Sequence, residues 1–228
     1  MTDGATIREL HRRLARAHGP LDPPRKRDPI EELVLTILSQ NTSDTNRDRA
    51  FAALREGYPT WEALAEAREA DLIRVIRPGG LANTKAPRIL AVLREIRARD
   101  GDLRLDWMRA APDEEITDYL VSLPGVGRKT AACVLAFSLG RPAIPVDTHV
   151  HRVAERLGLL PARTSAERAH DALDEAIPPP LRVPMHVALI RHGRAICKAA
   201  RPRCETCPVR DMCPSADELL ATRQNGPR

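Results

Sequence analysis

The amino-acid sequence predicts an all-α protein. Apolar residues recur at helical spacing along most of the chain, as in the i, i+3, i+7 set Phe51, Leu54 and Tyr58. No stretch alternates apolar and polar residues as a half-buried strand would, and no Asn-Gly or Asp-Gly pair joins two apolar runs. Proline and glycine separate the helical segments, for example at 78–80 and 178–180. We therefore expect short helices that pack through their apolar stripes.

The expected helices follow one another along the chain. The first is an apolar run after Pro29, and the second lies within 43–58, where Ser43 or Asp44 can cap the N-terminus. Further helices are expected at about 61–67, 69–77, 85–99, 113–122, 128–139, 148–158, 166–177 and 184–196. The last dozen residues are polar, and we expect them to fray.

Length and composition are those of one or two folded domains. The chain has 228 residues, with 36 Lys+Arg and 31 Asp+Glu, so its formal net charge is +5. Hydrophobic residues at 43% and charged residues at 29% exclude wholesale disorder. No apolar run approaches the roughly 18 residues of a membrane span, and the first residues lack the apolar segment of a secretory signal. We therefore expect a cytoplasmic protein.

Four of the five cysteines lie close together, with six, two and five residues between them: Cys197, Cys204, Cys207 and Cys213. In a reducing compartment such a group indicates a metal site more than two disulfides. Structural zinc commonly uses two C-x2-4-C pairs, and only one is present here. An iron–sulfur cluster tolerates the unequal spacing better, so it is favoured over zinc. Cys133 lies within an expected helix and is interpreted as a small buried residue.

A glycine-containing turn joins two expected helices at 123–130. Gly125 and Gly127 allow a tight turn that presents backbone N–H groups. Those groups, followed at once by a helix N-terminus, form an anion site that suits one phosphate. A purely structural corner between helices would use the same residues.

Lys129 occupies the first turn of the helix that follows this hairpin. A cation there opposes the helix dipole, at a cost of a few tenths to about 1 kcal/mol. The same field, together with partial burial, favours the neutral amine that a nucleophile requires. The alternative is a solvated lysine that contacts phosphate.

Asp147 opens the next expected helix, where it can serve simply as an N-cap. The helix from Lys129 rises on the order of 16 Å, and the connection 140–146 can return that distance at roughly 3.4 Å per residue. Lys129 and Asp147 can therefore line one cleft. An amine and a carboxylate at one site suit imine chemistry at a sugar C1′, with the carboxylate stabilising oxocarbenium charge.

Several motifs together resemble the endonuclease III family of helix-hairpin-helix DNA glycosylases. They are Leu-Pro-Gly-Val-Gly-Arg-Lys-Thr-Ala over 123–131, Val-Asp-Thr-His-Val-His-Arg-Val over 146–153, His-Gly-Arg over 192–194 and the four-cysteine loop. The resemblance runs from about Glu31 to Cys213. It implies a six-helix barrel domain with the helix-hairpin-helix at 31–141. It also implies a second helical domain, 1–30 and 142–228, that carries a [4Fe–4S] cluster, with the active cleft between the domains.

The resemblance further implies a bifunctional DNA glycosylase and AP lyase of base excision repair. Lys129 would attack C1′ of an extruded nucleotide and form a Schiff base, and β-elimination would break the strand on the 3′ side, with Asp147 in support. The implied DNA contacts are Gln40, Leu81, Gly125, Gly127, Arg128, Thr130, His149, Lys198, Arg201 and Arg203, and the implied cluster ligands are the four grouped cysteines. The expected partner is duplex DNA with damaged bases or abasic sites, bound by a monomer at the nucleoid.

Gln40 would fill the gap left by the extruded nucleotide, and Leu81 would wedge the opposite strand. An ordinary polar helix end and a loop leucine are the alternatives for these two residues. The segments 39–44 and 105–112 depart from the bacterial pattern and are similar to plant glycosylases that remove 5-methylcytosine.

We expect oxidised or saturated pyrimidines as substrates. The alternatives are a non-enzymatic DNA-binding module, a helical redox protein, and a related glycosylase that removes 5-methylcytosine or a mismatched base.

Overall fold

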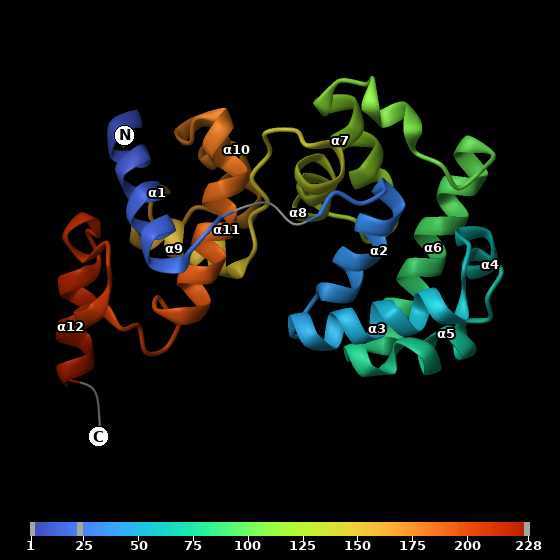
Figure 1. Cartoon of the computed structure of the whole chain (residues 1–228), viewed down its shortest axis with the longest axis horizontal. Helices are drawn as coiled ribbons and strands as arrows, with labels where there is room; N and C mark the ends of the chain where they lie inside the picture. Colours follow the sequence, from blue (N-terminus) through green and yellow to red (C-terminus); the bar gives the residue numbers. More distant parts are fainter. Residues whose placement is uncertain (1–2, 22–24, 226–228) are drawn as a thin grey trace. The chain divides into compact units, whose positions relative to one another are not determined.

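The computed structural model describes residues 3–21 and 25–225. Within these residues the secondary structure is entirely helical, with no strand, so the prediction of an all-α fold is confirmed (Figure 1). The chain divides into two compact units. One unit is Lys26–Gly140, and the other combines Met1–Arg25 with Arg141–Arg228.

The unit Lys26–Gly140 is built around a helix that is buried on almost every side. Its α-helices are α2 (Pro29–Ser39), α3 (Asp44–Gly57), α4 (Trp61–Ala65), α5 (Glu69–Ile76), α6 (Ala82–Asp100), α7 (Asp113–Ser122) and α8 (Arg128–Cys133). Short 3-10 turns lie at Arg77–Gly79 and Asp106–Arg109, and a π-helical segment at Val134–Leu139 continues α8. Helix α2 packs against α3, α6 and α8, and every residue from Glu32 to Leu38 is buried.

Local capping explains where the first helices of this unit begin. The Asp28 carboxylate accepts hydrogen bonds from the first turn of α2, whose first residue is Pro29. The predicted cap Ser43 is confirmed, since Asn46 N donates to its Oγ at 3.3 Å. Thr60 caps α4 in the same way.

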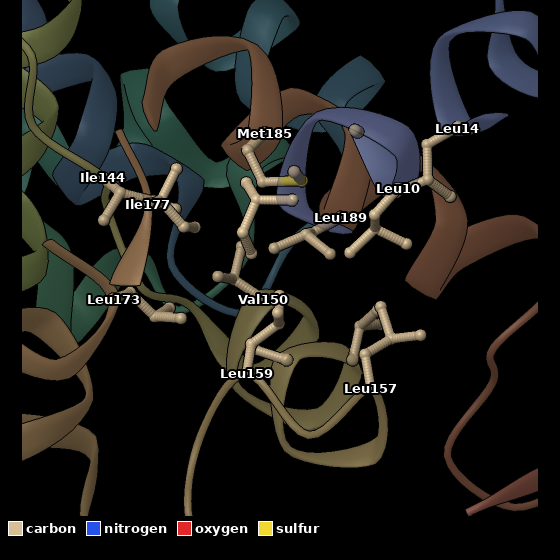
Figure 2. Packing of buried hydrophobic residues seen from close by; sticks show 14 of the residues in the cluster. Leu10, Leu14, Ile144, Val150, Leu157, Leu159, Leu173, Ile177, Met185 and Leu189 are labelled. Atoms are coloured by element: carbon tan, nitrogen blue, oxygen red, sulfur yellow. The ribbon is translucent and has the colours of Figure 1, made fainter. Parts of the chain in front are cut away.

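The second unit has its own apolar core. Its helices are α1 (Gly4–His18), α9 (Thr148–Arg156), α10 (Ala166–Ala176), α11 (Pro179–Ala195) and α12 (Ala216–Asn225), with 3-10 turns at Cys204–Thr206 and Arg210–Met212. Figure 2 shows Leu10 and Leu14 of α1 meeting Val150 of α9 and Leu189 of α11 in this core. Helix α11 packs against both α1 and α9.

Several helix limits differ from the sequence predictions. Helix α1 was not predicted, although Ile7, Leu10 and Leu14 form an i, i+3, i+7 stripe that the structure buries. Helix α11 begins at Pro179 instead of 184, because prolines are well tolerated in the first turn of a helix. The expected fraying of the last dozen residues is wrong as far as Asn225, since α12 extends to that residue.

Candidate active site and cysteine cluster

The turn between α7 and α8 is a tight hairpin. Leu123 and Val126 are buried beneath it, whereas Gly125 is exposed and has a φ of 72°. A Cβ on Gly125 would lie 2.5 Å from Nε of Arg88, so both conformation and space require glycine. Gly127 has an extended backbone, and a Cβ there would meet no atom within 4 Å. The Arg88 side chain therefore packs closely against the hairpin at Gly125, whereas there is open space beside Gly127.

The other predicted hairpin contacts differ in exposure. Gly127 is the N-cap of α8, and no side chain caps that helix. Arg128 is half-buried in the first turn. Thr130 is only 4% exposed, so its side chain faces the protein interior.

Lys129 is half-buried in the first turn of α8, above a buried acidic group that the sequence analysis missed. Glu32 of α2 is 4% exposed, and its Oε1 accepts a hydrogen bond from Thr36 at 3.3 Å. Burial raises the pKa of Glu32, while Arg27, Thr36 and Lys129 act in the opposite direction. Arg27 Nη1 lies 3.4 Å from Glu32 Oε2, so the buried carboxyl group also has a cationic partner.

Cys133 lies one helical turn beyond Lys129 and is 3% exposed, as expected for a small core residue. Burial raises the pKa of the Cys133 thiol, and the nearby Lys129 side chain, which hydrogen-bonds to it, partly offsets that effect. The buried thiol of Cys133 and the buried carboxyl group of Glu32 thus both interact with Lys129.

Asp147 lies in the other unit, where it caps α9. Val150 N donates to Asp147 Oδ1 at 2.7 Å, so the capping role foreseen as an alternative is present. The bond uses one of the two carboxylate oxygens, and the residue is half-buried. His186 is hydrogen-bonded to the carbonyl of Pro145 at 2.7 Å and so fixes the segment just before Asp147.

Gln40 and Leu81 occupy the ends of two helices of the unit Lys26–Gly140. Gln40 ends α2, and its Oε1 accepts a hydrogen bond from Arg88 Nη1 at 2.6 Å. Leu81 precedes α6 with a φ of 51° and is 53% exposed, the one large apolar side chain so exposed among the residues that the structure describes. No role was predicted for Asn41, which is exposed and also has a left-handed backbone conformation, with a φ of 50°. Asparagine adopts the left-handed conformation more readily than most residues do. Its position shortly before the Ser43 cap could therefore have indicated this conformation.

The four grouped cysteines line one small cavity together with apolar side chains, His192 and three arginines, Arg156, Arg203 and Arg210. Arg156 Nη1 donates to Cys197 Sγ at 3.4 Å, and Cys207 Sγ lies 3.6 Å from Nε2 of His192. Burial raises the pKa of Cys207 to about 11 and raises the pKa values of Cys204 and Cys213 as well. The cavity therefore disfavours bare thiolates unless a positive group compensates them.

The remaining predicted contacts lie near this loop. Lys198, Arg201 and Arg203 are exposed, and Arg203 also donates to the carbonyl of Ala195. His149 is half-buried with its Nδ1 3.1 Å from Arg152 Nη2, and burial lowers its pKa. The loop thus presents three cations to solvent.

Comparisons with protein families, with curated proteins and with solved structures all match this chain to DNA repair proteins. The model of the HhH-GPD superfamily of base excision DNA repair proteins matches residues 34–179. Endonuclease III of Thermotoga maritima is 37% identical over 206 residues, which cover 90% of this chain and 89% of that protein. Endonuclease III of Escherichia coli is 36% identical over 186 residues, which cover 81% and 83%. The structure of a trapped endonuclease III–DNA covalent intermediate has a TM-score of 0.82 at 30% identity, covering 96% of this chain and all of that chain.

The all-helical fold, the hairpin and these matches define a base excision repair enzyme that acts on DNA. The chain belongs to the HhH-GPD superfamily and, within it, to the endonuclease III family. It is thus a DNA glycosylase and AP lyase, and the non-enzymatic and redox alternatives no longer apply. No helix in the described ranges combines the length and the apolar character that crossing a membrane requires.

Proposed function

We propose that this enzyme removes oxidised or saturated pyrimidines from duplex DNA through a Schiff base on Lys129. The observation that carries the proposal is the half-buried amine in the first turn of α8, directly after a hairpin with open space at Gly127. A similar protein, endonuclease III, has been captured as a covalent intermediate with DNA. A covalent link to DNA requires a nucleophile, and Lys129 is the side chain at this position that forms an imine.

The proposed reaction begins with the neutral amine of Lys129. The bond between Nζ and C1′ forms as the C1′–base bond breaks, and the base departs with the bonding electrons. The amine loses one proton, and the departing base takes up a proton. The C1′–O4′ bond then opens as O4′ is protonated, which leaves a protonated imine between Nζ and C1′. Removal of a C2′ proton then breaks the C3′–O3′ bond and cuts the strand.

Asp147 is proposed to stabilise the positive charge that develops on the sugar and to transfer protons in the later steps. Its capping bond holds the carboxylate in a fixed orientation at the start of α9.

The hairpin and the basic loop are proposed to hold the DNA backbone. Exposed N–H groups at Gly125 and Gly127 suit a phosphate, and Lys198, Arg201 and Arg203 add positive charge. Contacts to phosphates position a duplex but carry no sequence information. Extrusion of a nucleotide costs a few kcal/mol, less for a damaged base, and Gln40 and Leu81 are proposed to fill the vacated space.

A [4Fe–4S] cluster is proposed to be held by Cys197, Cys204, Cys207 and Cys213. The donor set fits, because four sulfurs line one cavity that disfavours uncompensated thiolates. Among the described residues, no three His, Cys, Asp or Glu side chains are grouped around a single ion position. One zinc ion draws its sulfurs to about 2.3 Å from itself, whereas a cubane has four separate iron corners. When bound, the cluster supplies Fe–S bonds that tie the loop together.

A panel of duplexes, each with one altered base, tests the proposed substrate class. We expect release of oxidised or ring-saturated pyrimidines with subsequent strand cleavage, because a damaged base costs less to extrude. Base release and strand cleavage are scored separately. Faster release of 5-methylcytosine or of a mismatched base would contradict the proposed class while leaving the lyase chemistry intact.

Asp147→Asn is the matched variant in this panel. Asparagine also caps helices, so it keeps α9 while removing the charge. We expect both base release and strand cleavage to slow by about 10²-fold or more, the usual range for a positioned acid–base group.

A further inference from the structure

Five cationic side chains of α6 donate hydrogen bonds to other parts of the unit Lys26–Gly140, and three of them are Lys85, Arg88 and Arg94. Lys85 and Arg94 each donate to two backbone carbonyls, and Arg88 donates to the side chain of Gln40. None of the three was predicted to have a role from the sequence. Arg88 binds one proposed DNA contact directly, whereas the two partners of Lys85 each lie two residues before a proposed DNA contact, Gln40 or Leu81.

The Lys85 ammonium group is enclosed by protein. The residue is 2% exposed, and its Nζ donates to Leu38 O at 2.7 Å and to Gly79 O at 2.9 Å. Burying an ammonium is costly unless hydrogen bonds compensate it. The hydrogen bonds to the two carbonyls therefore compensate the cost of burying this charge. Through them, Lys85 links the two segments of chain that carry Leu38 and Gly79.

Each carbonyl lies just before a strained and exposed residue. Leu38 precedes Asn41 by three residues, and Gly79 precedes Leu81 by two. Asn41 and Leu81 are two of the three non-glycine residues with positive φ in the part of the chain that the structure describes. For Leu81 this conformation costs roughly 1–2 kcal/mol, and it persists only where the surroundings impose it.

Other contacts hold the same two turns. A Cβ on Gly79 would lie 2.9 Å from Cβ of Ala50, so the Arg77–Gly79 turn rests closely on α3. Arg88, one helical turn after Lys85, reaches Gln40 and lies beneath Gly125. Helix α6 thus connects the end of α2, the turn before Leu81 and the hairpin.

We propose that Lys85 is a positioning residue for nucleotide extrusion. Its ammonium group holds the end of α2 and the Arg77–Gly79 turn at a fixed separation, so that Gln40 and Leu81 enter the duplex together. This inference rests on the proposed function of Gln40 and Leu81. It assigns Lys85 no contact with DNA and no part in the imine chemistry.

A purely structural role for Lys85 is the alternative, and Arg94 provides the matched control. Arg94 Nε and Nη2 donate to Ala65 O and Ala67 O at 2.9 and 3.1 Å. The bonding is thus of the same kind, on the same helix, although Arg94 is more exposed. Its partners lie at the end of α4 and in the turn before α5, where no DNA contact is proposed.

The test compares Lys85→Met and Arg94→Met with the parent enzyme. Borohydride trapping is measured on an abasic site in single-stranded DNA, which needs no extrusion from a helix, and on the same site in a duplex. Thermal unfolding is followed in parallel, and trapping is measured well below both midpoints. For Lys85→Met we expect the duplex rate relative to the single-strand rate to fall by about ten- to hundredfold, since a misplacement of about 1 Å can cost that much. Arg94→Met should leave this ratio unchanged.

An unchanged ratio in Lys85→Met, or an equal fall in Arg94→Met, would overturn the proposal. Should Lys85→Met fail to fold, Lys85→Gln keeps one donor group and is expected to lower the ratio to an intermediate value. An unchanged ratio in this variant would also overturn the proposal. Absence of trapping by the parent enzyme on either substrate would instead contradict the proposed function.

Discussion

Replacement of Lys129 by alanine is expected to abolish the covalent adduct that borohydride traps on DNA with an abasic site. The amine is the proposed nucleophile, and no imine can be reduced without it. The variant should still bind the same DNA, because the hairpin that precedes α8 remains. Denaturing gels measure the adduct, and a binding titration at fixed salt measures the affinity.

The sequence contains only four lysines, at positions 26, 85, 129 and 198, so the controls are few. Lys198→Ala removes an exposed amine near the cysteine loop and should leave trapping at saturating DNA unchanged. Persistent trapping by Lys129→Ala would show that another amine performs the chemistry. Loss of trapping together with loss of binding would point to a damaged fold.

Replacement of Cys207 by alanine is expected to remove the iron–sulfur cluster and to destabilise the unit that contains it. The loop from Cys197 to Cys213 has few regular elements, and metal binding contributes directly to folding in such segments. We expect the free energy of unfolding to fall by about 4 kcal/mol or more, in the range of lost metal sites. Iron and sulfide content, visible absorption and urea unfolding measure the effect.

Cys133→Ala is the matched control because it removes the one cysteine outside the loop. The free energy of unfolding should fall by about 1 kcal/mol, as it does when a few side-chain atoms are removed from a core. The iron content should stay unchanged. Full iron content in Cys207→Ala would contradict the assignment of that ligand. Zinc in place of iron in the purified enzyme would contradict the proposed cluster.

The sequence predicted those parts of the fold that depend on local signals. The limits of α7 agree with the expected 113–122 because Pro112 precedes it, acidic residues occupy its first turn and the hairpin follows it. The Ser43 cap and the start of α8 after Gly127 agree for the same reason. Helix α1 had a comparable signal, with Asp3 as its cap and three apolar residues at helical spacing, and could have been predicted.

Glu32 and Lys85 were not predicted because their surroundings are created by distant segments. Charged residues are almost never fully buried unless they are paired, so composition places both on the surface. The carbonyl of Leu38 that binds Lys85 is 47 residues away in the chain. Glu32 acquires its raised pKa only because α2 is enclosed by neighbouring helices. Both features arise from packing that no periodicity encodes.

The most direct test of the central claim is to locate the reduced adduct in the chain. The trapped complex is digested with nuclease and protease, and mass spectrometry identifies the peptide that carries the sugar remnant. The modification is predicted on Lys129 alone, in the peptide that follows the hairpin. A remnant on Lys26, Lys85, Lys198 or the N-terminal amine would contradict the claim that the amine in the first turn of α8 attacks C1′.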